Sequence, residues 1–274
     1  MPELPETETI ARDLDRLVSG GEVRGCTILR PDVLRRVNAA SIGTKLIGRR
    51  IERTWRRAKI VVLDLNDGQR ILVQPRFTGS MRVIRDCDSP TLPHECVRLA
   101  LADGRALLYC DIRRLGTFSV VSEGQFSDID STLGIEPLDP AFTGARLSGI
   151  LRSSGRFVKV VLMDQRRIAG CGNIYACEAL WRAGIDPSRR ADLLSGDDAQ
   201  ALRDALVGVL SASIEARGTT FRDFRDARGE RGQFAASLEA YGRGGQPCRR
   251  CGHRMIETHA IDGRATHFCY RCQE

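Results

Sequence analysis

The spacing of apolar positions changes character along the chain. From residue 5 to residue 18 apolar side chains recur at helical intervals, and a glycine pair at 20–21 ends the run, which predicts one amphipathic helix. From residue 22 to about 123 they gather in short stretches such as KIVVLDL and RILVQPRF, separated by turn signals such as NDG and ADG. This second pattern predicts an all-β domain, a sandwich or a flattened barrel.

Helical spacing returns in the second half. Segment 128–142 contains several turn formers and two prolines, and we expect a linker there. Beyond it ARLSGILRSS, RFVKVVLMD and YACEALWRAG predict helices, whereas residues 218–245 are polar and rich in glycine and predict a long mobile loop. The expected fold class is α+β and multidomain: a helix with a β-domain over 2–127, the linker, a helical domain over 143–245 and a short module over 246–274.

Charge and composition narrow the class of partner. The 274 residues carry a formal net charge of +7 with a pI near 9.0, which favours a polyanionic partner without proving one. No apolar run approaches the length of a membrane span, so we expect no membrane association. The N-terminus lacks a basic region followed by an apolar stretch, so we expect no secretory signal and a cytoplasmic protein of a bacterium, at the nucleoid if DNA is the substrate.

Four cysteines form the strongest local signal. Cys248 and Cys251 are followed after 17 residues by Cys269 and Cys272, and two such knuckles supply four thiolates to a tetrahedral Zn²⁺ site. Disulfides or a chance arrangement are the alternatives, and a reducing compartment disfavours the first. A closed four-sulfur site leaves no open coordination position, so we predict one structural zinc that does not act as the catalyst.

A glycine-flanked asparagine marks a second candidate site. In AGCGNIYACE, Gly170 and Gly172 precede Asn173, and such a turn can present backbone N–H groups at a helix N-terminus, where phosphate binds well. On spacing alone, an ordinary corner between two helices fits equally well.

The opening MPELPETE offers a possible nucleophile. Methionine before the small residue proline is normally removed, which leaves Pro2 with a free secondary amine that titrates near ~8. Glu3 could then exchange a proton with a reacting group. Taken alone, the stretch is better explained as a helix start at Pro5 whose glutamates suit the helix dipole.

Taken together, these motifs resemble the formamidopyrimidine-DNA glycosylase family of bifunctional base-excision repair enzymes. The resemblance runs nearly end to end, through PELPETE, RRAK, DIRRLG, LGIEPL, GNIYACEALWRAGIDP, TTFRDFRDARGERGQF and RATHFCYRCQ. It implies a helix on a β-sandwich, a helix-two-turns-helix domain with a lesion-capping loop over about 218–240, and a zinc finger. It also implies a monomer that excises oxidised purines such as 8-oxoguanine and formamidopyrimidines from damaged double-stranded DNA.

The same resemblance assigns catalytic roles. Pro2 would attack the anomeric carbon and form a Schiff base, with Glu3 as proton donor and Glu6 as a supporting carboxylate. Lys59 matches the family lysine tied to β-elimination and phosphate contact. Arg264 matches the zinc-finger arginine that contacts phosphate and is assigned to δ-elimination. All of this requires removal of Met1, because an amide nitrogen at residue 2 is not nucleophilic.

Further matches concern DNA binding. Asn173 matches the asparagine of the phosphate grip, Lys159 the lysine that precedes that motif, and His94 a histidine associated with DNA binding. Together with Lys59 and Arg264, these residues are the expected contacts to the DNA backbone.

Two motifs depart from the family pattern. Where the family usually has an IHLGMSG-like stretch this chain has VQPRFTG, so Phe77 stands in place of methionine, and DPRRFG becomes DIRRLG, so Leu115 stands in place of an aromatic. Arg113, which would face the orphaned partner base, is retained. We hypothesise that Phe77 is the wedge that fills the gap left by the extruded base and that Leu115 is a smaller plug.

Two other functions stay open at this point. The first is the endonuclease VIII branch, which removes oxidised pyrimidines, although its PEGPE start lacks Leu4. The second is a non-catalytic protein that binds damaged DNA, for which the altered VQPRFTG stretch is the motive.

Overall fold

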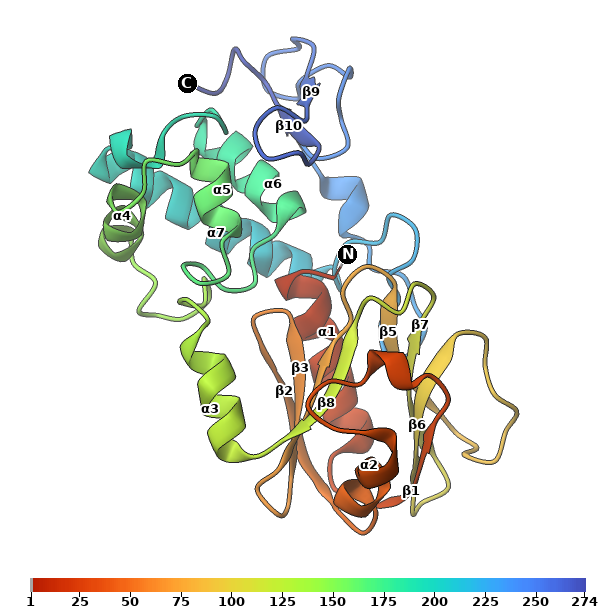
Figure 1. The fold of residues 1–274 in the computed structure, drawn as a ribbon. Helices are drawn as coiled ribbons and strands as arrows, with labels where there is room; N and C mark the ends of the chain where they lie inside the picture. Colours follow the sequence, from red (N-terminus) through yellow and green to blue (C-terminus); the bar gives the residue numbers. More distant parts are fainter. Residues whose placement is uncertain (1) are drawn as a thin grey trace. The chain divides into compact units, whose positions relative to one another are not determined.

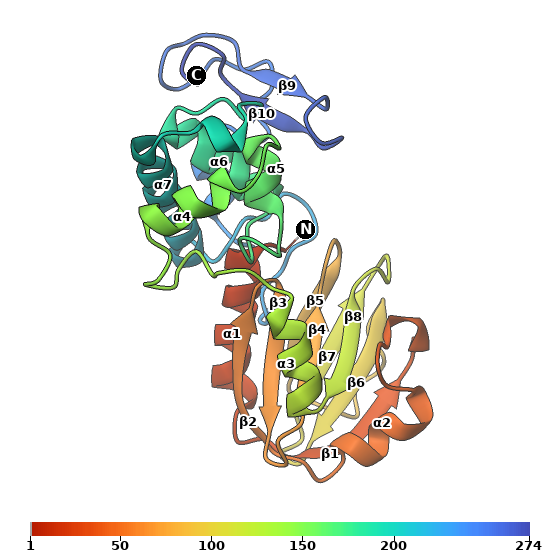
Figure 2. The ribbon, with the colours of Figure 1, turned by 60° about the vertical axis from the view of Figure 1, so that its left-hand side comes forward.

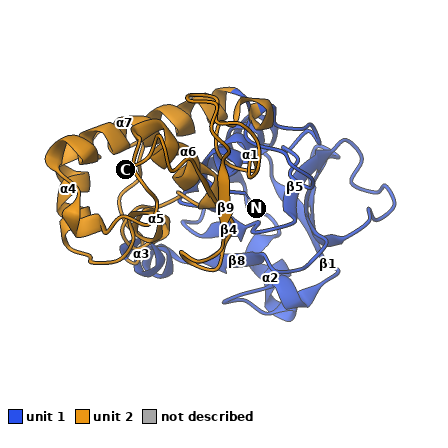
Figure 3. Ribbon diagram, turned by 90° about the horizontal axis from the view of Figure 1, so that it is seen from above, with its two compact units in different colours: residues 1–131, 216–233 blue, residues 132–215, 234–274 orange. Residues whose placement is uncertain are grey.

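The computed structural model describes residues 2–274, which divide into two compact units (Figure 3). The first unit comprises residues 1–131 and 216–233, and the second comprises residues 132–215 and 234–274. Across the described part of the chain no helix combines the length and the apolar character needed to cross a membrane.

The first unit opens with α1 (Leu4–Val18), which confirms the predicted N-terminal helix. Its apolar face is fully buried at Ile10, Leu14 and Val18. Proline at the start of the helix suits the first turn, where the missing N–H would have no partner.

Two four-stranded antiparallel sheets complete this unit and confirm the predicted sandwich (Figures 1 and 2). One sheet has the order β1 (Val23–Ile28), β6 (Glu95–Leu101), β7 (Ala106–Asp111) and β5 (Gly79–Ile84), and the other β2 (Ile51–Arg57), β3 (Ile60–Leu65), β4 (Arg70–Gln74) and β8 (Thr117–Val121). Short helices η1 (Pro31–Val33) and α2 (Ala39–Leu46) precede the second sheet in sequence. One apolar core joins α1 to residues of both sheets.

A helix covers the outer face of the second sheet. Figure 2 shows α3 (Glu123–Ser131) lying over this sheet, and Phe126 of α3 packs in one apolar cluster with Val62 and Leu72. Strands β3 and β4 are therefore buried on both faces, which explains the nearly continuous apolar run in KIVVLDL.

The second unit is helical and ends in a small hairpin. Its elements are α4 (Gly144–Arg152), α5 (Val158–Met163), α6 (Asn173–Ala183), η2 (Ala191–Leu193), α7 (Gly196–Glu215), η3 (Phe234–Ser237), β9 (Ile256–Thr258) and β10 (Thr266–Phe268). All residues of α6 from Ile174 to Trp181 are buried, so α6 is the central helix of this unit.

Two features differ from the expected organisation. Helix α3 runs to Ser131, into the segment 128–142 that we expected to be a linker. Residues 216–233 pack with the first unit, although we expected a mobile loop inside a helical domain over 143–245. The second difference arises from contacts of residues 217 and 219 with α1, which polar patterning does not reveal.

Candidate functional site

Two carboxylates are buried at the start of α1. Glu3 is 2% exposed and Glu6 is 1% exposed, and Pro2 beside them is buried. The Glu3 backbone N–H donates to Glu6 Oε2 at 2.8 Å, and the Thr219 N–H donates to Glu6 Oε1 at 2.7 Å. Each oxygen of Glu6 thus accepts a backbone N–H, which fixes the backbone that carries Pro2 and Glu3.

Lys59 lies in the tight turn between β2 and β3, half-buried beside Ala58 at φ +52°. Arg56 holds this turn, since it donates to the Ala58 carbonyl at 3.0 Å and to Glu8 Oε2 of α1 at 2.9 Å. Burial raises the pKa of Glu8, but Arg56 and Arg12 outweigh that effect and hold the pKa below its usual value.

The register between α1 and β2 places this turn near the start of the helix. Asp15 accepts the Thr54 N–H at 2.7 Å, and Glu8 pairs with Arg56, so residue numbers fall along α1 as they rise along β2. Continuing in that direction brings Pro2 and Glu3 toward the end of the sheet that carries Lys59.

The same end of the sandwich presents Phe77 and Arg113. Phe77 is 46% exposed on the loop before β5, and the Arg113 guanidinium carbon lies 5.0 Å from the centroid of its ring. Leu115 is 40% exposed on the loop after β7. The structure therefore brings Phe77, Arg113 and Leu115 onto two neighbouring loops, the wedge loops, with Phe77 and Arg113 already in contact.

Asp111, at the end of β7, holds the two loops together. It is 2% exposed, and its Oδ1 accepts the Thr78 hydroxyl at 2.5 Å and the Arg113 N–H at 3.1 Å. Its Oδ2 accepts the Gly116 N–H at 2.8 Å and the Tyr109 hydroxyl at 3.1 Å. One buried carboxylate thus orders four donors around the exposed side chains.

His94 is exposed immediately before β6, with φ +62°. Its carbonyl accepts the Asp111 N–H at 2.9 Å, so it lies beside the wedge loops. It also lines a surface hollow of about 680 Å³ whose charged residues are of both signs, and Arg114 there pairs with Asp32 at 3.0 Å.

In the second unit, Asn173 lies at the start of α6 and contacts the zinc-finger hairpin. Gly172 is the N-cap and Asn173 is the first helical residue, which confirms the predicted turn. The Asn173 Nδ2 donates to the Ala265 carbonyl at 2.8 Å, which places the first turn of α6 next to Arg264. The partial positive charge of a helix start and a nearby guanidinium together suit a phosphate.

Lys159 was expected to contact the DNA backbone, but the structure places it in the interior of the second unit. Its side chain is fully buried, and its Nζ donates to Asp262 Oδ1 at 3.0 Å and to the Thr266 hydroxyl at 2.7 Å. Asp262 Oδ1 also accepts the Arg264 N–H at 3.1 Å. Lys159 therefore braces the hairpin that presents Arg264, and it offers no exposed charge for a direct contact with DNA.

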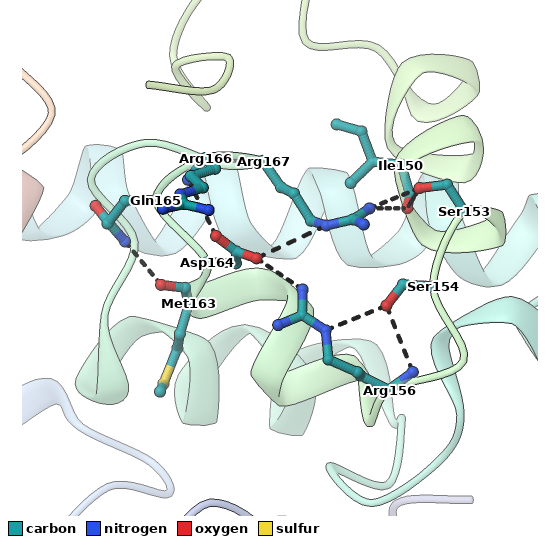
Figure 4. A network of polar contacts seen from close by, with 9 residues as sticks. All are labelled: Ile150, Ser153, Ser154, Arg156, Met163, Asp164, Gln165, Arg166 and Arg167. Atoms are coloured by element: carbon teal, nitrogen blue, oxygen red, sulfur yellow. Dashed lines mark hydrogen bonds and ion pairs between the residues drawn. The ribbon is translucent and has the colours of Figure 1, made fainter. Parts of the chain in front are cut away.

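Gln165 fixes the turn that precedes α6 (Figure 4). Its Nε2 donates to the Met163 carbonyl at 2.9 Å and to the Cys171 carbonyl at 2.7 Å, and its Oε1 accepts the Gly170 N–H at 2.8 Å. The neighbouring Asp164 binds Arg156 at 2.7 Å. These contacts hold the turn in one conformation before any ligand arrives.

The four cysteines of the terminal module converge. Their sulfur atoms all lie within 4.8 Å of one another, and the Cys251 and Cys269 sulfurs are 3.5 Å apart. A tetrahedral zinc with four thiolates requires sulfur separations of about 3.8 Å, so the donor set fits Zn²⁺.

Some residues of these sites were not identified from the sequence. Asp111, Gln165 and Asp262 act through contacts with other turns, and only Asp111 carries a local hint, as an acid directly after a strand. Arg217 and Asp13, discussed below, carry no such hint because 204 residues separate them.

Known proteins of one family match the whole chain. Family models match for the formamidopyrimidine-DNA glycosylase N-terminal domain over residues 1–118, for the H2TH domain of that enzyme over 133–225 and for the zinc finger found in FPG and IleRS over 245–274. The formamidopyrimidine-DNA glycosylase of Syntrophotalea carbinolica is 42% identical over 275 residues, and that of Xanthomonas campestris pv. campestris is 40% identical over 273. In both cases 100% of each chain is covered.

The chain belongs to the formamidopyrimidine-DNA glycosylase family. Solved structures agree: Lactococcus lactis Fpg (MutM) bound to DNA containing N7-Benzyl-Fapy-dG has a TM-score of 0.92 at 30% identity, with 100% of each chain covered. The complex of Lactococcus lactis Fpg with DNA containing an abasic site has a TM-score of 0.91 at 29% identity, with 99% of each chain covered.

Membership in this family favours a formamidopyrimidine-type DNA glycosylase of base excision repair over both the endonuclease VIII branch and a non-catalytic DNA-binding protein. It also confirms the expected fold class and, with the four-cysteine cluster, the expected structural zinc.

Proposed function

We propose that this protein excises oxidised purines from damaged double-stranded DNA and then cleaves the strand at the resulting abasic site. The observation that carries the proposal is the pair of buried carboxylates after Pro2, in which Glu6 accepts the N–H groups of Glu3 and Thr219. This arrangement holds a terminal amine and an acid in fixed positions, as covalent catalysis requires.

In the proposed reaction, the Pro2 nitrogen of the chain without Met1 attacks the anomeric carbon. The glycosidic bond breaks as the nitrogen–carbon bond forms, and the base leaves with the bonding electrons and takes up a proton that balances the one lost by the Pro2 amine. Glu3 protonates the sugar ring oxygen, the ring opens and a Schiff base forms. Loss of a proton from the adjacent sugar carbon then expels the 3′ phosphate, and a second elimination expels the 5′ phosphate. Lys59 assists the first elimination and Arg264 the second.

The second unit supplies the grip on the DNA backbone. The first turn of α6, the Asn173 side chain and Arg264 would bind phosphate, and the zinc would hold the Arg264 hairpin rigid. In the first unit, Phe77, Leu115 and Arg113 would fill the gap left by the extruded nucleotide. We further propose that the protein acts as a monomer in the bacterial cytoplasm.

Oxidised purines are the proposed substrate class for three reasons. Leu4 distinguishes the opening from that of the pyrimidine-specific branch, and residues 219–234 resemble the loop that the purine-specific branch folds over its lesion. The matched structures also contain formamidopyrimidine or abasic-site DNA. Excision of 8-oxoguanine should therefore exceed excision of thymine glycol from matched duplexes, and the reverse order would favour the pyrimidine branch.

Borohydride trapping tests the central step. The protein is incubated with a duplex containing 8-oxoguanine and reduced, and the cross-linked peptide is sequenced by mass spectrometry. We expect DNA attached to the nitrogen of Pro2 in a chain without Met1. DNA attached to a lysine would contradict the assigned nucleophile, and tight binding without cross-linking or strand cleavage would favour a non-catalytic damage sensor.

A further inference from the structure

The segment that returns to the first unit, residues 216–233, is fastened to α1 at two positions. Glu6 accepts the Thr219 N–H at 2.7 Å, and Asp13 Oδ2 accepts from Arg217 Nη2 at 2.5 Å. Glu6 and Asp13 are seven residues apart, so they lie on the same face of the helix, two turns from each other. The return segment therefore runs along one face of the helix whose first turn carries Pro2 and Glu3.

Arg217 joins two buried acids. Asp13 and Asp226 are each 1% exposed, and Arg217 pairs with both, with its Nε 3.1 Å from Asp226 Oδ2. Burial lowers the pKa of Arg217, but hydrogen bonds to Asp226 and Asp13 outweigh this effect and raise the pKa above its usual value. Two carboxylates this deeply buried require a cation that can form several hydrogen bonds, and the forked guanidinium supplies it.

Contacts around Arg217 hold together the two ends of the segment, residues 216–218 and 232–233, which form its neck. The Gln233 N–H donates to the Ala216 carbonyl at 2.8 Å, and a side chain on Gly232 would lie only 2.6 Å from the Arg217 carbonyl oxygen. Arg217 itself has φ +60°, a conformation that a non-glycine residue keeps only where its surroundings impose it. The neck is therefore tightly packed.

Beyond the neck, three consecutive exposed residues form a tip between two buried residues. Thr220 and Phe224 are buried, whereas the three residues between them, 221–223, are exposed. Asp226 Oδ1 accepts the N–H groups of Arg228 at 3.0 Å and Glu230 at 2.9 Å, which shapes the return of the chain. The ion pair with Arg217 thus sets the position of the tip relative to α1.

We propose that Arg217 is a positioning residue for recognition of the damaged base, because its bridge from Asp13 to Asp226 sets where the exposed tip stands relative to Pro2 and Glu3. This inference rests on the proposed function, in which the tip covers the extruded base. The tip would contact the base and not the sugar. Loss of Arg217 should then impair base excision and spare strand cleavage at an abasic site, where no base is present.

Two matched variants test this role. Arg217→Met removes the charge and keeps the side-chain length, and Arg16→Met removes the same charge from an exposed position of α1, outside the segment. We expect Arg217→Met to slow single-turnover excision of 8-oxoguanine at least ~10-fold and to change cleavage of a preformed abasic duplex by less than ~2-fold. The control should behave as the unaltered protein. Equal losses on both substrates, or no loss on either, would overturn the proposal.

A second measurement does not depend on catalysis. Amide hydrogen exchange at Arg228 and Glu230 should accelerate in Arg217→Met and stay unchanged in Arg16→Met, since both amides bond to Asp226. Unchanged exchange at these two amides would contradict the proposal that Arg217 holds the tip in place, even if the unaltered protein proved to have no glycosylase activity. If Arg217→Met does not fold, Arg217→Lys keeps the charge and loses the fork, and a selective loss of excision supports the proposal while equal losses overturn it.

Discussion

Buried carboxylates hold the turns that carry exposed functional side chains. Glu6 holds the start of α1 and Asp111 holds the wedge loops. Glu178, in α6, accepts the N–H groups of Glu239, Ala240 and Tyr241, and it thereby anchors the chain entering the zinc module. Burial raises the pKa of Glu178 against the opposing effect of these bonds. In each case the carboxylate orients its neighbours and does not itself face solvent.

Replacing Asp111 by asparagine should disturb both wedge loops. The amide offers one acceptor oxygen where the carboxylate offers two, so at least one of the four donors around residue 111 loses its partner. We expect a stability loss of ~1–3 kcal/mol and slower excision from duplex DNA. Thermal unfolding gives the first quantity and single-turnover kinetics the second. Normal kinetics in a destabilised variant would show that Asp111 acts on folding alone.

Loss of the Phe77 ring should slow excision from duplex DNA far more than excision from single strands. A wedge stabilises the duplex after the damaged nucleotide leaves, and base–aromatic stacking contributes ~1–3 kcal/mol, so Phe77→Ala should slow duplex excision about 10- to 100-fold. A single-stranded substrate has no gap to fill and should be affected far less. Ile112→Ala, which shortens another exposed side chain nearby, is the control. Equal losses on both substrates would contradict the wedge role of Phe77.

Among whole elements, those with regular patterns could be predicted from the sequence. Helix α1, the sandwich and the turn before α6 follow from apolar spacing and glycine positions. The path of segment 216–233 does not, because it depends on Glu6 and Asp13 far away in sequence. Lys159 shows the same limit: its motif matches a DNA-binding family, but its burial depends on Asp262 in the hairpin.

Removal of zinc should release the hairpin that carries Arg264. Strands β9 and β10 have only three residues each, and a hairpin this short is not stable without its metal. After chelation we expect amide exchange to accelerate between Cys248 and Cys272, with the sandwich unchanged, and DNA affinity to fall at least ~10-fold. Readdition of Zn²⁺ should restore both. Unaltered protection of the hairpin after verified metal loss would show that Lys159 and Asn173 hold it without zinc.

For the whole molecule, the excess of basic residues implies binding that depends on salt. With a net charge of +7, much of the affinity for DNA should come from release of counterions, so the logarithm of the binding constant should fall linearly with the logarithm of salt concentration. Arg264 is expected to contact one phosphate. Arg264→Gln should therefore reduce the slope by about one and weaken binding to damaged and undamaged duplexes alike.

Leu115→Ala provides the contrast within the same assay. This side chain is exposed and uncharged, so its loss should leave the salt slope unaltered and weaken binding to damaged duplex alone, where the nucleotide is extruded. The two variants together separate the phosphate contacts from the wedge. If Arg264→Gln left the slope unchanged, the guanidinium would not contact phosphate in the bound state, and its part in the second elimination would lose its physical basis.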